Sequence, residues 1–349
     1  MRIGFLSIWF ERGQTIVTKT LRDCLSAEHE TFIFARMGVV YGKAKQDQED
    51  INNITYYPTY QVKQEDFSAW IIKNKLDVVV FNEEYDWGLV LAARNCKVKT
   101  ITYLDFYTDK WKNYMYLFDL VLCSTHRTYN MVKDICNTKF IGWGVDTDLF
   151  KPQDSGEKFT FFHNAGWLGI NYRKMTPLAI AAFDELSKVD DSVSLLVHAQ
   201  AERDLLPKEI NEIIDLNPKI KYLVKTIPAP GLYHQGEILL FTSKLEGLGL
   251  PLPEGLSCGL PAIVCNAAPM NEFVKDGYNG VCIPVYRFED RNDGVAFPEA
   301  IMNPDKLIEA MAKHREIVEL SYNARQSILD NFSLVGLRKR LLDIFREYV

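Results

Sequence analysis

The run Asp77-Val78-Val79-Val80-Phe81 constrains the fold of this chain more than any other segment. The four residues from Val78 to Phe81 are all apolar. They lack the alternation of apolar and polar residues that marks a strand with one solvent-facing side. Such a continuous β-branched run indicates a strand buried on both faces, as found in parallel sheets covered by helices on either side. The sequence therefore predicts an α/β protein.

Strand-like runs and helical patterns alternate along the whole chain, as parallel sheets with crossover helices require. In the first half, we expect strands at 2–8, 31–35, 76–82, 98–105, 120–124 and 138–143. A break rich in Gly, Pro and Asp follows at 142–156, and the alternation then restarts. In the second half, we expect strands at 159–164, 192–198, 220–227, 237–242, 262–266 and 280–284, and tail helices at 304–313, 317–329 and 335–347.

A chain of 349 residues is long for one α/β domain and suits two. We expect an N-terminal Rossmann-like domain at 1–150, a C-terminal Rossmann-like domain at 151–332, and a last helix at 333–349 that packs back toward the first domain. Two doubly wound parallel-sheet domains joined by a hinge would face each other across a cleft. The carboxyl ends of the strands would line that cleft, where such folds bind their ligands.

Composition narrows the class of partner. The net charge of −6 argues against nucleic acid, which needs clustered Lys and Arg. The seven cysteines are widely spaced without a C-x-x-C pattern, so neither a disulfide framework nor a zinc site is predicted. The first apolar run is too short for a signal peptide, and none reaches the roughly 18 residues of a membrane span. These features predict a reduced, cytoplasmic protein.

The segment 243–254, SKLEGLGLPLPE, carries the clearest chemical signal and follows directly on a buried strand. Its glycines allow close approach of backbone to a ligand, and Pro251 suits the first turn of a helix whose free N–H groups would attract phosphate. Glu246 lies in the loop and Glu254 in the first helical turn, so both can face one ligand. Carboxylates only accept hydrogen bonds, which makes sugar hydroxyls their natural partners.

A purely structural interpretation also exists for this segment, in which Glu254 complements the helix dipole and the glycines serve a tight turn. The seven residues between the two Glu, the strand–loop–helix context and the trailing Gly259-Leu260-Pro261 together favour a ligand site.

With these motifs the chain resembles the retaining glycosyltransferases of family GT4, which have the GT-B fold of two facing Rossmann-like domains. The family's E-x7-E motif falls on Glu246 and Glu254, and its following G-x-P matches Gly259-Leu260-Pro261. The segment 144–152, GVDTDLFKP, is similar to the family's inter-domain segment. The resemblance extends over nearly the whole chain and is specific in the second half.

The resemblance implies a role for each matching residue. Glu254 would bind the ribose hydroxyls of the nucleotide, and Glu246 would hold the donor sugar. The segment Gly247, Leu248, Gly249 and Leu250 would lie near sugar and phosphate. Arg173-Lys174 is similar to the basic pair that neutralises the diphosphate, although a solvated helix start is the alternative. Because charge builds up on the leaving diphosphate, fixed cations there would stabilise the transition state.

In the first half the match is looser. Gly13 corresponds best to the glycine of the loop that approaches the diphosphate, in an otherwise glycine-poor segment. Asp105 stands where many family members have a His near the reacting carbon, and a helix cap is its alternative role. Glu83-Glu84 would either touch the acceptor or form a solvated loop, and His163 is more typical of a structural residue.

Asp146-Thr147-Asp148 resembles the D-x-D motif by which another glycosyltransferase fold binds metal and diphosphate. Here it lies in the expected hinge, where the family has it without a metal role, so we predict no metal and no cofactor.

The resemblance thus implies retaining transfer of a sugar from a UDP-, GDP- or ADP-sugar to a hydroxyl of a glycan or glycolipid. A basic face of the last helix, with Arg338, Lys339 and Arg340, would allow peripheral membrane contact. The alternatives are a nucleotide-sugar epimerase or a phosphorylase on the same fold, and a non-catalytic protein that binds a nucleotide sugar. The base, the sugar, the linkage and the oligomeric state are not predicted.

Overall fold

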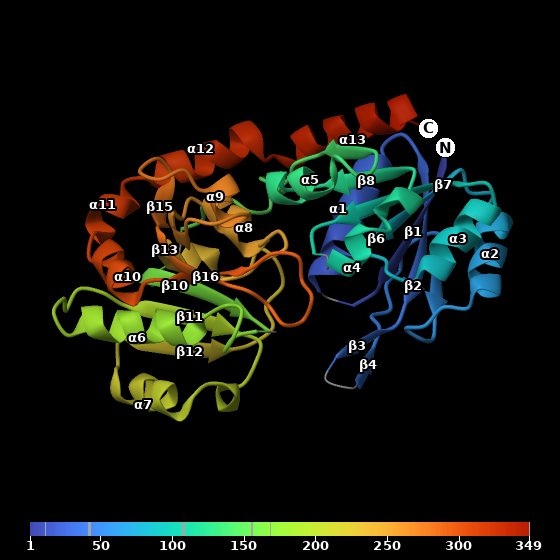
Figure 1. Ribbon diagram of the computed structural model, residues 1–349. Coiled ribbons are helices and arrows are strands. Elements are labelled where there is room, and N and C mark those ends of the chain that lie inside the picture. Colours follow the sequence, from blue (N-terminus) through green and yellow to red (C-terminus); the bar gives the residue numbers. More distant parts are fainter. Residues whose placement is uncertain (11, 41–42, 107–108, 155, 168, 349) are drawn as a thin grey trace. The chain divides into compact units, whose positions relative to one another are not determined.

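Two parallel sheets, each buried between helices, organise the chain in a computed structural model that describes residues 1–10, 12–40, 43–106, 109–154, 156–167 and 169–348 (Figure 1). Unit 1 comprises Met1–Gly144, Gly294–Ala296 and Leu334–Val349. Unit 2 comprises Val145–Asp293 and Phe297–Ser333. The boundary at Gly144 falls within the Gly- and Pro-rich break of the sequence.

Unit 1 is built on a sheet of seven described strands in the order β5-β2-β1-β6-β7-β8-β9, all parallel. Its elements are β1 (Arg2–Ile8), α1 (Gly13–Leu25), β2 (Glu30–Arg36), β3 (Gly38–Val40), β4 (Lys43–Lys45), β5 (Ile54–Tyr57), α2 (Gln64–Lys73), β6 (Val78–Asn82), α3 (Trp87–Asn95), β7 (Lys99–Leu104), α4 (Asp109–Lys112), η1 (Met115–Leu117), β8 (Leu120–Cys123), α5 (His126–Val132), β9 (Thr138–Phe140) and α13 (Leu334–Tyr348).

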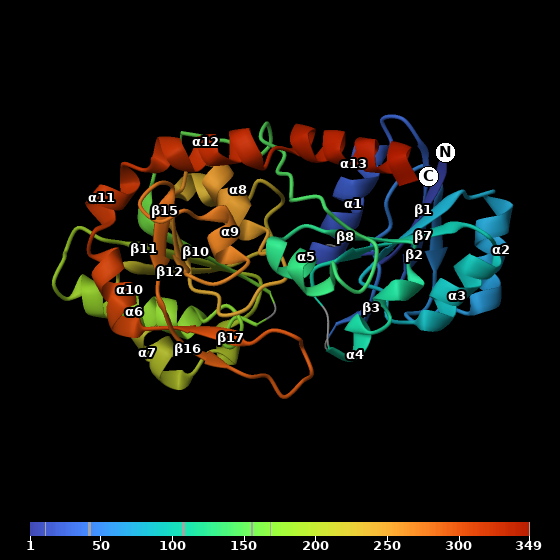
Figure 2. The same cartoon turned by 45° about the horizontal axis from the view of Figure 1, so that its top comes forward.

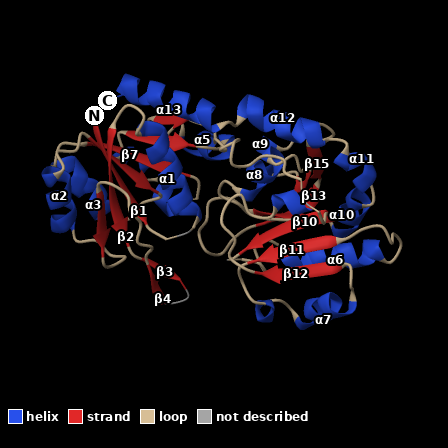
Figure 3. Cartoon of the chain, turned by 180° about the vertical axis from the view of Figure 1, so that it is seen from behind, coloured by secondary structure: helices blue, strands red, loops and turns tan. Residues whose placement is uncertain are grey.

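Helices cover both faces of this sheet, as the apolar run of β6 predicts. All five residues of β6 are buried. Helices α1 and α13 pack together on one face and α2 and α3 on the other (Figures 1 and 3). The last helix, α13, buries Leu337, Leu341 and Phe345, so its apolar stripe belongs to the core of unit 1.

Unit 2 has a second parallel sheet, in the order β12-β11-β10-β13-β14-β15. Its elements are β10 (Phe159–Gly166), α6 (Thr176–Ser187), β11 (Leu195–Ala199), η2 (Arg203–Leu205), α7 (Lys208–Leu216), β12 (Ile220–Val224), η3 (Tyr233–Gln235), β13 (Gly236–Phe241), α8 (Pro251–Ser257), β14 (Ala262–Cys265), α9 (Met270–Phe273), β15 (Gly280–Ile283), β16 (Val285–Glu289), β17 (Glu299–Met302), α10 (Pro304–Met311), α11 (His314–Val318) and α12 (Ser321–Asn331). Helices α6 and α7 lie on one face of the sheet and α8 and α9 on the other (Figure 3).

Both sheets are doubly wound, which fixes where a ligand can bind. The strand order reverses between β1 and β6 in unit 1 and between β10 and β13 in unit 2. At such a reversal the loops after the two strands leave the sheet in opposite directions and open a crevice at the carboxyl edge. In unit 2, these are the loops that carry Arg173-Lys174 and Glu246.

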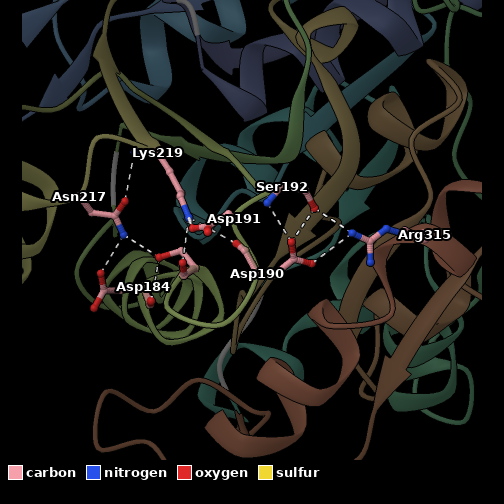
Figure 4. A network of polar contacts seen from close by, with 8 residues as sticks. Asp184, Asp190, Asp191, Ser192, Asn217, Lys219 and Arg315 are labelled. Atoms are coloured by element: carbon pink, nitrogen blue, oxygen red, sulfur yellow. Dashed lines mark hydrogen bonds and ion pairs between the residues drawn. The ribbon is translucent and has the colours of Figure 1, made fainter.

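The opposite, amino-terminal edge of the unit 2 sheet is closed by a polar network (Figure 4). Lys219 donates to the carbonyl of Ser187 at 2.9 Å and to the carboxylate of Asp191 at 2.8 Å. Arg315 donates to the Ser192 hydroxyl at 2.9 Å, and Ser192 donates in turn to Asp190. These contacts tie the turn after α6 to the segments before β12 and in α11, so they are structural bonds.

In the second half, one expectation was wrong and one element was not predicted. The single helix predicted at 317–329 is two helices, because α11 packs against β13 and α12 turns away to pack against α8. At the start of α12, the Ser321 hydroxyl donates to the carbonyl of Gly259 at 2.6 Å. The sequence also gave no sign of the antiparallel hairpin β16–β17, whose strands lie side by side in Figure 2. In both places tertiary contacts override local pattern.

Candidate active site

Glu246, Arg173 and Lys174 come together at the reversal point of the unit 2 sheet. The Lys174 ammonium donates to Glu246 Oε1 at 2.6 Å, and Arg173 donates to Glu246 Oε2. Lys174 and Glu246 are 5% and 4% exposed, whereas the Arg173 side chain keeps 31% of its surface exposed. A buried carboxylate held by two cations leaves a net charge of +1 at the edge of the sheet.

Burial and charge act in opposite directions on this group. Burial by itself raises the pKa of Glu246, but the charges of Arg173 and Lys174 outweigh it, and the pKa lies below its usual value. Burial lowers the pKa of Lys174, against the opposing charge of Glu246. Each ion therefore depends on the other to stay charged in this buried position.

The main chain fixes the basic pair ahead of α6. The amide of Lys174 donates to the carbonyl of Gly169 at 2.8 Å, and the Thr242 hydroxyl donates to the carbonyl of Lys174 at 2.9 Å. The amide of Lys244 donates to the carbonyl of Arg173 at 3.0 Å. Since α6 begins only at Thr176, Arg173 and Lys174 are loop residues tied to the loop after β13.

The segment Gly247, Leu248, Gly249 and Leu250 joins Glu246 to α8. Gly249 has φ +80°, a conformation that costs other residues energy, and a Cβ atom there would lie 3.4 Å from Glu246 Cγ. Leu248 is 5% exposed, so its side chain anchors the segment in the core. The backbone is thereby held close to the aliphatic part of the Glu246 side chain.

Glu254 lies in the first turn of α8, with a partner that the sequence did not suggest. The hydroxyl of Tyr233 donates to Glu254 Oε2 at 2.7 Å, and Asn164 at the end of β10 donates to the Tyr233 hydroxyl at 3.2 Å. Burial raises the pKa of Glu254 to about 7. A carboxyl with this pKa exchanges its proton near neutral pH, so a ligand hydroxyl can favour the ionised form.

His163, on β10, is fully engaged in the core. Its Nδ1 lies 2.8 Å from the carbonyl of Leu240 and its Nε2 lies 2.9 Å from the Thr176 hydroxyl. Burial lowers the pKa of His163 to about 4, which keeps the ring neutral. It therefore links β13 to the start of α6, behind the basic pair.

In unit 1, Gly13 and Glu83 lie at the reversal point between β1 and β6. Gly13 begins α1, and a Cβ atom there would meet nothing within 4 Å. Gln14 donates to Glu83 Oε2 at 3.3 Å, while the amide of Phe106 donates to Glu83 Oε1 at 2.7 Å. Burial, and then the charge of Asp105, raise the pKa of Glu83 to about 7. The carboxyl group of Glu83 is thus held by hydrogen bonds within the fold, and Glu83 is not a solvated loop residue.

Asp105 follows β7 and is 5% exposed. The hydroxyls of Tyr103 and Ser124 donate to its two carboxylate oxygens. Glu84, the neighbour of Glu83, forms a buried ion pair with Arg36 at 2.9 Å. The carboxyl edge of the unit 1 sheet therefore carries several buried, mutually bonded polar side chains.

The D-x-D triplet in the expected hinge forms a turn. Asp146 Oδ1 accepts from the amides of Asp148 and Leu149 at 3.0 and 3.1 Å.

Across the described part of the chain, no three His, Cys, Asp or Glu side chains are grouped closely enough to hold a metal ion. Over the same residues, no helix has the length and apolar character needed to cross a membrane.

Two doubly wound units, one of which presents Glu246 with two cations at its reversal point, are the architecture expected of a sugar-transferring enzyme of the GT-B type. Comparison with known proteins gives the same result, since residues 169–315 match the family described as Glycosyl transferases group 1. The chain is therefore a glycosyltransferase with the GT-B fold.

Individual relatives extend the likeness over the rest of the chain. A UDP-Gal:alpha-D-GlcNAc-diphosphoundecaprenol alpha-1,3-galactosyltransferase from Escherichia coli is 25% identical over 292 residues, which cover 74% of this chain and 71% of that protein. A glycosyltransferase from Rickettsia africae ESF-5 superposes with a TM-score of 0.78 at 16% identity, over 99% of this chain and 98% of the other. Anabaena Alr3699/HepE, in complex with UDP and glucose, gives a TM-score of 0.74 at 15% identity, over 99% of this chain and 100% of the other.

Proposed function

We propose that the protein transfers a hexosyl group from a UDP-hexose to a hydroxyl of a glycan or glycolipid, with retention at the anomeric carbon and without a metal ion. The observation that carries the proposal is the buried contact of Glu246 with Lys174 and Arg173. Similar proteins support the choice of substrates, since one is a UDP-Gal-dependent transferase acting on a diphosphoundecaprenol-linked sugar and another binds UDP and glucose.

In this proposal Lys174 and Arg173 neutralise the departing diphosphate. Charge on the leaving group rises as the glycosidic bond breaks, so fixed cations are worth more in the transition state than in the ground state. A metal ion supplies the same stabilisation in other transferases. Glu246, already anchored by the cations, accepts hydrogen bonds from hydroxyls of the donor sugar.

The nucleotide is held further along the same loop and helix. The backbone of Gly247, Leu248, Gly249 and Leu250 lies along sugar and phosphate, and Glu254 accepts from the ribose hydroxyls. The proposal also assigns Gly13 a role in binding the diphosphate and Asp105 a role in the transfer step. These contacts hold the donor in one orientation, which lowers the entropic part of the barrier.

The class of acceptor decides whether the enzyme has to work at a membrane surface. For a lipid-linked acceptor we propose peripheral contact with the membrane surface. Of the three adjacent cations at 338–340 in α13, Arg338 and Lys339 are exposed, but Arg340 donates to the carbonyl of Ile141 at 2.5 Å. The basic face of that helix is therefore smaller than its sequence suggests. This favours binding through recognition of a glycan or lipid headgroup over attraction of the helix to a charged membrane surface.

Product analysis tests this function. Purified protein is incubated with UDP-galactose or UDP-glucose and a lipid-linked or free sugar acceptor, with and without EDTA, and the new linkage is assigned by NMR. An α-linked product that forms equally well with EDTA supports retention and metal independence. A β-linked product contradicts retention, and loss of activity in EDTA that a divalent cation restores contradicts metal independence.

The alternatives give different products in the same assay. An epimerase interconverts the two UDP-sugars without releasing UDP, and a phosphorylase acts only when free phosphate is added.

Replacement of Asp105 by Asn distinguishes a catalytic role of this residue from a structural one. A catalytic carboxylate predicts slower turnover with unchanged UDP affinity, whereas a structural one predicts only a lower melting temperature.

A further inference from the structure

The hairpin β16–β17 brings a second buried carboxylate beside the proposed donor site. Glu299, the first residue of β17, is 4% exposed. Its Oε2 accepts from Lys244 at 2.7 Å, and its Oε1 accepts from Arg291 at 2.9 Å and from the hydroxyl of Tyr172. One carboxylate thus gathers three donors from three different segments of unit 2.

Two of these donors adjoin residues of the donor site. Tyr172 directly precedes Arg173, and Lys244 lies two residues before Glu246. The Lys244 ammonium lies 3.6 Å from the centre of the Tyr172 ring, so the two side chains also contact each other. Glu299 therefore holds together the two loops that supply the cation and the carboxylate of the Arg173–Glu246 pair.

The main chain strengthens this arrangement. The amide of Ala300, next to Glu299, donates to the carbonyl of Lys244 at 2.9 Å, and the amide of Lys244 donates to the carbonyl of Arg173 at 3.0 Å. The hairpin, the loop after β13 and the loop after β10 form a continuous chain of bonds. A shift of β17 would be passed to Glu246 and Arg173 through these contacts.

We propose that Glu299 is a positioning residue for the donor site, which acts through Lys244 and Tyr172 to hold Glu246 and Arg173 in place for the nucleotide sugar. This inference rests on the proposed function. Positioning matters at such a site because a displacement of ~1 Å can cost ~10²-fold in rate. Glu299 itself does not touch the substrate in this account.

The test compares Glu299→Gln with Glu289→Gln by titration of UDP and by the rate of UDP release from UDP-hexose. Glu289 is the cross-strand partner of Glu299 in the same hairpin, but its side chain is 42% exposed, and its ion pair among the described residues is with Arg287. We expect Glu299→Gln to weaken UDP binding by about tenfold or more, and Glu289→Gln to leave it unchanged. Equal affinities for the two variants and the unaltered protein would overturn the positioning role while leaving the proposed function intact.

A double variant separates positioning from simple charge compensation. Glu299→Gln leaves Lys244 buried without its carboxylate, so Lys244→Met is added to remove that charge. We expect the double variant to regain melting temperature but not UDP affinity; recovery of both would show that Glu299 only neutralises Lys244, and would overturn the proposal.

A milder variant covers the case in which Glu299→Gln does not fold. Tyr172→Phe removes only the phenol oxygen of a side chain that is 50% exposed. We expect a lower melting temperature, because one internal hydrogen bond to the buried carboxylate is lost, and a UDP affinity that falls only about threefold, because Glu299 keeps its other two donors. Unchanged affinity would contradict the inference. Failure of the unaltered protein to bind any nucleotide would remove the proposed function together with it.

Discussion

The ammonium of Lys174 lies 2.6 Å from the carboxylate of Glu246, across two loops that leave neighbouring strands in the middle of the unit 2 sheet. Both groups are almost completely buried. Because an isolated buried charge is costly, such a pair is held only where its geometry is good. Its position at the reversal point of the sheet links the stability of this region to its proposed chemistry.

Replacement of Lys174 by Ala should slow turnover by about tenfold or more, a barrier change of at least ~1.4 kcal/mol. The reason is the loss of a fixed cation from the departing diphosphate. UDP release from the donor at saturating concentration measures it, with circular dichroism to verify the fold. Lys208→Ala on α7, whose side chain is 89% exposed, is the control. Unchanged turnover in Lys174→Ala would remove this residue from the mechanism.

Replacement of Glu254 by Ala should act mainly on nucleotide binding. The carboxylate is proposed to accept from the ribose hydroxyls, and a lost hydrogen bond to a charged group costs about 1.5–3 kcal/mol, roughly tenfold to a hundredfold in affinity. Calorimetric titration of UDP into the variant and into Glu212→Ala, a change on the exposed side of α7, provides the comparison. Equal affinities for both proteins would refute the ribose assignment.

The raised pKa of Glu254 also predicts a pH effect on stability. Between pH 4.5 and about 7 the unfolded chain loses this proton while the folded protein keeps it, so ionisation favours unfolding as pH rises. Glu254→Gln removes this contribution. The melting temperature of the variant, relative to the unaltered protein, should therefore be higher at pH 8 than at pH 5. A difference that is the same at both pH values would show that the pKa of Glu254 is not raised.

Gly249→Ala tests the backbone beside Glu246. At φ +80° an alanine costs about 1–2 kcal/mol, and its Cβ atom would contact the side chain of Glu246. We expect a lower melting temperature together with weaker UDP binding. Gly277→Ala is the matched control, since this glycine has φ +69° and a Cβ atom there meets nothing within 4 Å. Normal UDP affinity in Gly249→Ala would separate this segment from the donor site.

Much of the fold could be predicted because most strands and helices have a recognisable local pattern of apolar and polar residues. The uninterrupted apolar run at Val78 indicated a sheet covered on both faces, and β6 is buried throughout. The spacing of Glu246 and Glu254 around a Gly- and Pro-rich turn likewise placed one carboxylate in a loop and the other in the first turn of a helix, as α8 shows.

The remaining features depend on contacts between segments far apart in the chain. Nothing local marks Tyr233 as the partner of Glu254, or Glu299 as the partner of Lys244, because each contact forms only when the sheet assembles. The break between α11 and α12 has no Gly or Pro to signal it and follows from packing on different elements. Buried polar pairs of this kind have no sequence periodicity of their own.

The most direct test of the central claim is to mix the purified protein, without metal, with UDP-, GDP- and ADP-sugars and to measure binding and nucleotide release. We predict tight binding of the UDP-sugar with slow hydrolysis, both lost when Glu246 and Glu254 are replaced together. Binding without release, even when sugar and glycolipid acceptors are present, would contradict catalysis at this site. No binding to any of the three donors would contradict the donor site assigned to Glu246, Lys174 and Glu254.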